Sequence, residues 1–313
     1  MKILAATAAV AALLTGAAQA DWAPSGQIDF VIGFAAGGGT DTLARLIAED
    51  IQAQQGWTVV PKNAEGGGGA VMAREVMAAE PDGQTIGFGI TDNFAYGMLA
   101  SRDPGYGADD FTYLTTIAGT QMAVVAKADR GWTTMTDVFE AMRGGESISF
   151  GTMTPRLADG AYYIGLQNDV EFNIVSSYKG GRAVLNAINA DDVDIGWVAG
   201  PQAGGVAAGD LVNLVNGEDI PLSVSPDAQS LSDIGVEYFF GATFLALAPA
   251  GLPDDAREAL TDAIVAAIST EGSKSNTFIE RVFVLKVAAG PDAAAYVANE
   301  AADAEALLDA TSQ

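Results

Sequence analysis

The sequence predicts an α/β protein built from two α/β domains that are joined by two crossover strands. Short β-rich runs alternate with segments of helical period, which is typical of βαβ units around a parallel sheet. Two long β-rich stretches, 111–126 and 236–248, bracket a self-contained βα block. After residue 249 the patterns are mostly helical, and we expect these helices to pack back onto the first domain.

The first twenty residues have the pattern of a secretory signal peptide. Lys2 precedes an apolar run from Ile3 to Leu14, and small residues follow up to Ala20. We therefore expect cleavage after Ala20, a mature chain that starts at Asp21, and export to the periplasm. An uncleaved membrane anchor is the alternative, but the apolar run is short for a bilayer span.

Composition excludes several classes of function. The chain has 313 residues, a formal net charge of −25, no cysteine and no histidine. Such an acidic protein is a poor partner for nucleic acid or anionic lipid. The missing residue types remove Ser-His and Cys-His nucleophiles, the usual zinc sites and all disulfides. We expect no metal and no cofactor.

The first domain starts with three strands, each followed by a helix. Gly56 is a natural end for the first helix, and Pro61 is expected to end the second strand. The expected strands are 28–34, 57–61 and 85–90, and the expected helices are 40–56, 70–80 and 92–100.

Predicted strands and helices alternate again in the middle of the chain. The expected strands there are 147–152, 172–178, 194–199 and 211–216, and the expected helices are 133–145, 157–169 and 181–190. We expect a first lobe of residues 21–120 and 243–313 and a second lobe of residues 121–242. The chain would cross between the lobes near Gly119 and Gly241.

Two glycine runs lie between a predicted strand and the helix that follows it. They are Gly37–Gly39 and Gly66–Gly69. Glycine allows close approach of a ligand to the backbone, and N–H groups at a helix start attract anions. The nucleotide fingerprints fail, because Thr42 and Val71 occupy the positions where G-x-G-x-x-G needs its last glycine. Tight turns without a ligand are the alternative for each run taken alone.

The chain resembles the substrate-binding proteins of tripartite tricarboxylate transporters, also called the Bug family. The resemblance rests on "IDFVIGFAAGGGTDTLAR", "GGGGAVMAREVMAAEPDGQTIGFG" and "SSYKGGRAVLNAINADDVDIGW", and it covers nearly the whole chain after residue 20. The family's Gly-Gly-x-x-Asp-x-x-Ala-Arg pattern falls on Gly37, Gly38, Asp41, Ala44 and Arg45. The resemblance implies a type II-like periplasmic binding protein fold that closes on a small carboxylate by hinge motion.

The resemblance also implies which residues meet the ligand. Backbone amides of the two glycine loops would hold one carboxylate, while Asp41 and Arg45 would hold the first loop. The family often has Asn-Arg-Pro before its second loop, where this chain has Asn63, Ala64 and Glu65, so a carboxylate lies near the expected anion site. The loop residues that the resemblance implies are Ala36, Gly37, Gly38, Gly39, Thr40, Gly66, Gly67, Gly68 and Gly69. Their positions after predicted strands add Thr91 and Asn93 of the first lobe and Thr152, Met153, Thr154 and Arg156 of the second lobe as candidates.

Two functions remain open. The leading one is a monomeric solute receptor for a di- or tricarboxylate, which delivers its ligand to transporter membrane subunits and catalyses nothing. The alternative is an exported enzyme that uses carboxylates such as Asp41, Asp92 and Asp194 on a small organic acid. No nucleophile motif supports the enzyme. Arg156 would meet the far end of a diacid, with an exposed arginine as the alternative.

Overall fold

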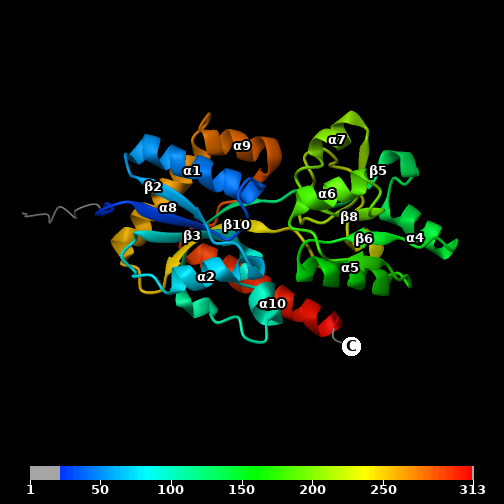
Figure 1. Cartoon of the computed structure of the whole chain (residues 1–313), viewed down its shortest axis with the longest axis horizontal. Helices are drawn as coiled ribbons and strands as arrows, with labels where there is room; N and C mark the ends of the chain where they lie inside the picture. The colour runs from blue at the N-terminus through cyan, green and yellow to red at the C-terminus, as the bar shows by residue number, and fades with distance from the viewer. Residues whose placement is uncertain (1–21, 312–313) are drawn as a thin grey trace, which may run out of the picture.

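The computed structural model describes residues 22–311, so the expected signal peptide and its cleavage site lie outside the described residues. Two lobes lie side by side, each with a central sheet and helices on both faces (Figure 1). None of the helices described over this range is long and apolar enough to span a membrane.

The first lobe contains a six-stranded mixed sheet in the order β11-β4-β10-β3-β1-β2. Strands β1, β2 and β3 are parallel, and β10 runs antiparallel between β3 and β4. The strands are β1 (Ile28–Ile32), β2 (Val59–Asn63), β3 (Thr85–Ile90), β4 (Phe111–Gly119), β10 (Thr243–Pro249) and β11 (Val284–Leu285).

Helices cover both faces of this sheet. Helix α1 buries Leu43, Ala44, Ile47 and Ile51 and ends at Gly56, whose φ of 74° is the left-handed conformation that glycine adopts readily. The helices are α1 (Gly39–Gln55), α2 (Ala70–Met77), α3 (Tyr96–Ala100), α8 (Asp254–Ser269), α9 (Lys274–Val282) and α10 (Pro291–Thr311), with the short turns η1 (Gly67–Gly69), η2 (Thr91–Asn93) and η3 (Ala108–Asp110).

The second lobe contains a five-stranded mixed sheet in the order β7-β6-β8-β5-β9. Its strands are β5 (Met122–Lys127), β6 (Ser149–Gly151), β7 (Asn173–Val175), β8 (Ile195–Ala199) and β9 (Leu211–Asn216). Its helices are α4 (Met135–Arg143), α5 (Pro155–Gln167), α6 (Gly181–Asn189) and α7 (Ala203–Ala208), with the short turns η4 (Ala128–Arg130) and η5 (Ser232–Ile234).

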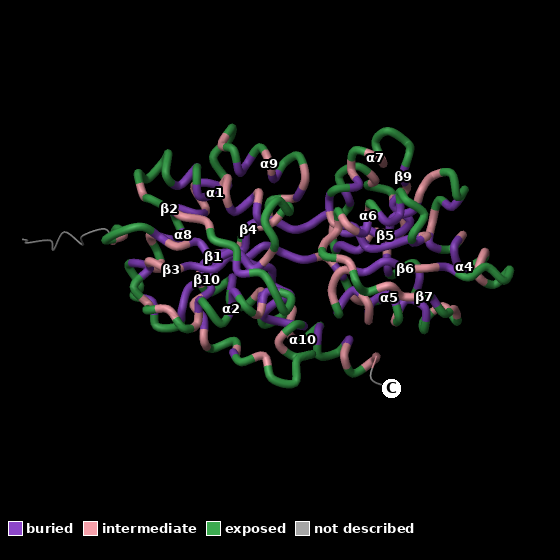
Figure 2. The backbone as a smooth tube through the Cα atoms, in the orientation of Figure 1, coloured by how far each residue is buried: buried purple, intermediate pink, exposed green. Residues whose placement is uncertain are grey.

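The chain passes between the sheets twice, and both passages are buried (Figure 2). The first long β-rich stretch is two strands, because β4 ends at Gly119 in one sheet and β5 begins at Met122 in the other. In the second long β-rich stretch, only the residues from Thr243 onward form a strand, which is β10.

The lobes also touch through helices. Ala95 and Tyr96, at the start of α3, belong to the core of the second lobe, and so do Ala304 and Leu307 of α10. The last turns of α10 lie beside α5 (Figure 1). The C-terminal helix therefore packs on the first lobe, as the sequence led us to expect, and also on the second lobe.

Two local predictions are wrong. Pro61 does not end the second strand, because β2 is an edge strand and continues to Asn63, and an edge position tolerates a residue without an N–H donor. The helices α7 and α9 and the two-residue strand β11 were not predicted from the sequence. The predicted strand over 211–216 is confirmed as β9.

Candidate functional site

The first glycine loop follows β1 and is held by the carboxylate of Asp41. The Gly37 N–H donates to Asp41 Oδ2 at 2.9 Å, and Arg45 Nε donates to Oδ1 at 2.9 Å. Burial acts to raise the pKa of Asp41, but hydrogen bonds from Arg45, Gly37 and Asn63 outweigh it, so the pKa is lowered. The expectation that Asp41 and Arg45 hold the loop is confirmed.

Asn63 at the end of β2 completes this support. Its Nδ2 donates to the Phe34 carbonyl at 2.9 Å and to Asp41 Oδ1 at 2.8 Å. Its Oδ1 accepts from Arg45 Nη2 at 2.8 Å. Sequence reasoning noted Asn63 only as part of the family pattern, although its place at a strand end beside the glycine loops was the available signal.

The expected ligand positions of the first loop are presented to solvent. Ala36, Gly37, Gly38 and Gly39 are exposed, and Thr40 is partly buried. Gly38 is the N-cap of α1 and makes no side-chain cap bond. The first N–H groups of this 17-residue helix therefore point out of a loop that has no side chains to shield them.

The second glycine loop follows β2, which pairs in parallel with β1, so both loops lie at the same edge of the sheet. Gly69 lies beside the end of β1, because a Cβ on Gly33 would come within 3.4 Å of the Gly69 Cα atom. Gly66, Gly67, Gly68 and Gly69 all have positive φ, between 57° and 131°, so the loop requires glycine at each position. The first three are exposed and Gly69 is buried. The structure thus brings both predicted loops together at the carboxyl ends of β1 and β2.

Thr91 and Asn93 lie in η2, behind the second loop, and both side chains are bonded within the protein. Thr91 Oγ1 donates to Glu300 Oε2 at 2.9 Å. Asn93 Nδ2 donates to the Gly68 carbonyl, and Asn93 Oδ1 accepts from the Ile90 N–H at 3.0 Å. Thr91 is 0% exposed and Asn93 is 2% exposed, so both support the loop in this structure.

The second-lobe candidates precede α5. Thr154 is the N-cap of that helix and accepts from the Leu157 N–H at 3.3 Å. Thr152 is fully buried, and its Oγ1 has no hydrogen-bond partner among the described residues. Met153 is half-buried and packs toward Gly181 at the start of α6. Trp197 is a core residue and donates to the Leu157 carbonyl.

Arg156 lies on α5 and is engaged with the other lobe. Its Nη1 is 3.5 Å from Asp92 Oδ1, and its Nη2 donates to the Phe239 carbonyl at 2.7 Å. Nη1 also donates to the Gly241 carbonyl at 3.2 Å. Burial raises the pKa of Asp92, and the charge of Arg156 opposes that effect. The guanidinium is therefore bound to Asp92 and to the crossover strand.

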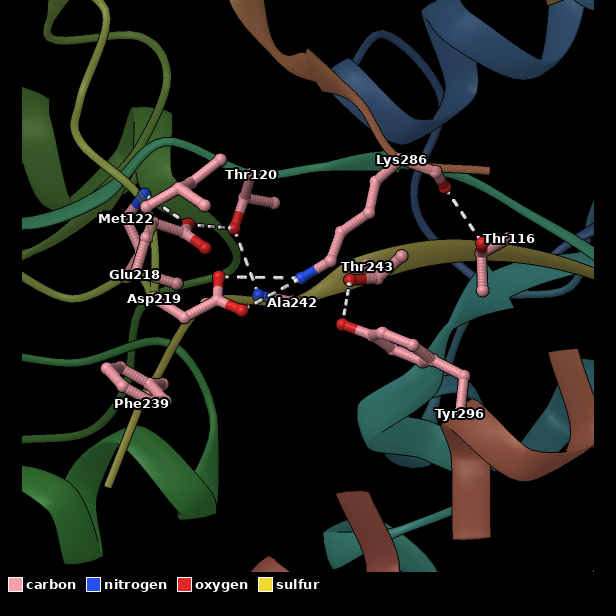
Figure 3. A network of polar contacts seen from close by, with 12 residues as sticks. Thr116, Thr120, Met122, Glu218, Asp219, Phe239, Ala242, Thr243, Lys286 and Tyr296 are labelled. Atoms are coloured by element: carbon pink, nitrogen blue, oxygen red, sulfur yellow. Dashed lines mark hydrogen bonds and ion pairs between the residues drawn. The ribbon is translucent and has the colours of Figure 1, made fainter. Parts of the chain in front are cut away.

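A polar network joins the two crossovers (Figure 3). Glu218 Oε1 accepts from Thr120 Oγ1 at 2.8 Å and from the Met122 N–H at 2.7 Å. Burial raises the pKa of Glu218 to about 7, although those hydrogen bonds act in the opposite direction. Lys286 of the first lobe lies 3.5 Å from Asp219. Glu218, Asp219 and Lys286 line a cavity of about 260 Å³ beside the hinge.

The carboxylates that an enzyme would use do not form one cluster. Asp41 belongs to the first glycine loop, Asp92 pairs with Arg156, and Asp194 binds Arg130 Nη1 at 2.7 Å. Among residues 22–311, no group of three or more acidic side chains is placed to hold a metal ion.

Solved structures show the same fold. The chain aligns with an R. palustris protein solved with adipate at a TM-score of 0.81, with 23% identity, over 92% of this chain and 98% of that one. MatC from Rhodopseudomonas palustris, solved with bound malate, aligns at a TM-score of 0.77 with 20% identity, over 91% of this chain and 99% of that one. The predicted two-lobed periplasmic binding protein fold is therefore confirmed.

Sequence comparison extends this result to the family. A UPF0065 protein of Bordetella pertussis is 26% identical over 265 residues, which are 81% of this chain and 80% of that protein. Another from Agrobacterium vitis is 26% identical over 270 residues, which are 82% and 76% of the two chains. Residues 43–293 match the family described as "Tripartite tricarboxylate transporter family receptor". The chain is thus a member of the tripartite tricarboxylate transporter receptor family of solute-binding proteins.

Proposed function

We propose that this protein is a periplasmic receptor that captures a small organic dicarboxylate or tricarboxylate and delivers it to the membrane subunits of a tripartite tricarboxylate-type permease. The observation that carries the proposal is that both exposed glycine loops follow the carboxyl ends of the neighbouring strands β1 and β2. Ligands of open α/β sheets bind at this edge. The solved structures with malate and adipate support a carboxylate as the ligand.

The proposed anion site is made of backbone. In a protein of net charge −25, N–H groups of a helix start and of a glycine loop supply local positive potential without a basic side chain. Ala36–Thr40 and Gly66–Gly69 would hold one carboxylate. Thr152, Met153 and Thr154 would meet the rest of the ligand from the second lobe. Thr91, Asn93 and Arg156 would support the site from behind.

Closure of the lobes on the ligand is part of the proposal. A ligand that bridges two lobes stabilises the closed arrangement, because it has contacts there that the open arrangement lacks. The crossovers at 119–122 and 241–243 are the only strand connections between the two sheets in the described chain, and they would carry the hinge motion. Small-angle scattering with and without ligand measures the change in radius and tests whether the protein is a monomer.

A thermal-shift screen across organic acids, followed by calorimetry, tests the function. Malate and adipate are the first probes, with acetate as a monocarboxylate control. A true ligand at one hundred times its dissociation constant stabilises the folded state by about 2.7 kcal/mol. Recovery of each acid unchanged after incubation distinguishes the receptor from an exported carboxylate-using enzyme. No stabilisation by any di- or tricarboxylate would refute the proposal.

A further inference from the structure

The turn η2 carries three consecutive polar side chains that are all buried. Thr91 is 0% exposed, Asp92 is 9% exposed and Asn93 is 2% exposed. Burying polar groups costs free energy unless they find partners, so their partners define what the turn does. Each of the three reaches a different part of the protein.

Asn93 fixes the second glycine loop. It bonds to the Gly68 carbonyl on one side and to the Ile90 N–H on the other. A Cβ on Gly69 would lie 2.5 Å from Asn93 Cγ, and one on Gly89 would lie 2.6 Å from Asn93 Oδ1. The amide is therefore packed between the loop and β3. Because glycine has little conformational preference of its own, this amide decides where the N–H groups of the loop point.

Asp92 reaches the second lobe. Among residues 22–311, its one ion-pair partner is Arg156 of α5, at 3.5 Å, which exceeds hydrogen-bond length and makes the contact an electrostatic one. Arg156 in turn donates to the carbonyls of Phe239 and Gly241 in the second crossover. A movement of the second lobe therefore displaces the charge that faces Asp92.

Thr91 anchors the turn to the hinge. Its Oγ1 accepts from the Thr243 N–H at 3.4 Å, at the point where β10 begins, and donates to Glu300 of α10. The turn closes on itself through hydrogen bonds from Phe94 and Ala95 to the Thr91 carbonyl. Asp92 and Asn93 therefore move together.

We propose that η2 couples the position of the second lobe to the geometry of the second glycine loop, with Asn93 as the positioning residue of the loop and the Asp92–Arg156 pair as the contact with the second lobe. The coupling itself is a property of the ligand-free protein. Its consequence for affinity rests on the proposed function, because it assumes that the loop amides hold the ligand.

Amide hydrogen exchange of the ligand-free protein tests the coupling. The reporters are the N–H groups of Gly69 and Val71, which both donate to the Gly66 carbonyl inside the loop. Arg156→Gln removes a charge on the opposite lobe. We expect exchange at these two amides to become about tenfold faster, because the turn that holds the loop opens more often. If the Gly69 and Val71 amides of Arg156→Gln exchange at the same rate as in wild type, the proposal is overturned.

Two further variants separate coupling from general destabilisation. Lys286→Gln breaks the other ion pair between the lobes, with Asp219, and is expected to leave exchange at Gly69 and Val71 unchanged. Asn93→Ser is expected to speed exchange by itself, and adding Arg156→Gln to it should give no further increase. Equal acceleration by Lys286→Gln, or additive effects in the double variant, would also overturn the proposal. Asp92→Asn replaces Arg156→Gln if the latter does not fold, because it removes the charge of the other partner in the pair and is expected to speed exchange at the same two amides.

Calorimetry with malate distinguishes this inference from the proposed function. If Arg156→Gln speeds loop exchange and also weakens malate binding, both stand. If exchange responds but no di- or tricarboxylate binds the wild-type protein, the coupling stands and the proposed function fails. If malate binds and exchange does not respond, the coupling fails and the proposed function stands.

Discussion

Arg156 and Asp92 form a buried ion pair between the two lobes, with their side chains 10% and 12% exposed. Arg156 lies at the strand-to-helix position where this architecture places ligands, yet its guanidinium faces the first lobe and the second crossover. Removing one partner of a buried pair leaves an uncompensated charge, which is more damaging than the loss of the attraction alone.

Arg156→Ala is therefore expected to lower the free energy of unfolding by about 3–5 kcal/mol. Burial already raises the pKa of Asp92, so this carboxylate destabilises the variant most at high pH, where it is ionised. Urea unfolding should show a smaller loss at pH 5 than at pH 8. Arg156→Ala combined with Asp92→Asn should be more stable than Arg156→Ala alone at pH 8. Equal stability of the two variants would contradict a buried ion pair.

Gly38→Ala tests the first glycine loop without straining it. Gly38 has a φ of −77°, and a Cβ there would lie 3.5 Å from the Ala35 carbonyl, so alanine fits the backbone. Its methyl group shields the helix N–H groups, and we expect calorimetry to show malate affinity reduced by about tenfold or more, which is roughly 1.4 kcal/mol.

The free energy of unfolding of Gly38→Ala should change by less than about 0.5 kcal/mol, as for an ordinary surface substitution. Gly204→Ala in α7 is the control, since no atom lies within 4 Å of its Cβ; it should leave affinity unchanged and raise stability by up to about 1 kcal/mol, because alanine is the better helix former. Gly68→Ala should lose affinity and also about 1–2 kcal/mol of stability, because Gly68 has a φ of 63°. Full affinity in both loop variants would refute the backbone site.

Asp41→Asn tests the support of the first loop. The carboxylate accepts from Gly37, Arg45 and Asn63, and an amide replaces one of its oxygens with a donor. We expect the free energy of unfolding to fall by about 1–3 kcal/mol and malate affinity to fall with it. The pKa of Asp41 is lowered on folding, so this stabilisation is present at neutral pH and disappears as the pH falls through the folded-state pKa.

Asp82→Asn is the control for Asp41→Asn. The pKa of Asp82 is also lowered, by hydrogen bonds from Gln84, but Asp82 lies in the turn before β3, at the other end of that strand from the glycine loops. It should leave malate affinity unchanged. Loss of affinity in Asp82→Asn equal to that in Asp41→Asn would show that the effect is not specific to the loop.

Glu218 gives the hinge a pH dependence. Its pKa is raised to about 7 from 4.5 on folding, so between these values the folded state binds more protons than the unfolded state. Stability therefore decreases as the pH rises through this window, by up to about 3 kcal/mol at full ionisation. Glu218→Gln keeps an oxygen for Thr120 and Met122 but does not titrate.

The measurement is the stability difference between wild type and Glu218→Gln as a function of pH. Between pH 4.5 and pH 8 the free energy of unfolding of wild type should fall relative to that of Glu218→Gln, because the wild-type carboxylate ionises while it is buried. A difference that stays constant across this range would show that Glu218 does not change its charge on this scale in the folded protein.

Much of the fold follows from the sequence because the period of apolar residues determines strands and helices locally. The same holds for the second glycine loop, since four consecutive positive φ values favour glycine at every position. The extent of β2 could not be predicted, because whether Pro61 is tolerated depends on the edge position of the strand, and that position depends on the whole sheet.

Side-chain direction is the part of the site that the sequence leaves open. Thr91, Asn93 and Arg156 lie in loops or helix starts next to strand ends, as predicted, but their partners come from residues up to 209 positions away. Nothing in the sequence indicated that Glu218 is buried, since an acidic residue after a strand is ordinarily exposed. Its burial depends on the two crossovers, which place Thr120, Met122 and Gly241 around the carboxylate.

The central place of β10 in the first sheet has a consequence for the order in which the molecule assembles. β10 lies between β3 and β4, and it begins at residue 243, after the complete second sheet. Until residues 243–249 arrive, β3 and β4 have no shared neighbour, and the first sheet is two separate pieces. All five strands of the second sheet lie between residues 122 and 216 and need nothing from later strands. A chain that emerges from its N-terminus can thus pair all strands of the inserted sheet first, although the core of that lobe still lacks Ala304 and Leu307 of α10, and the lobe that carries both glycine loops is finished last.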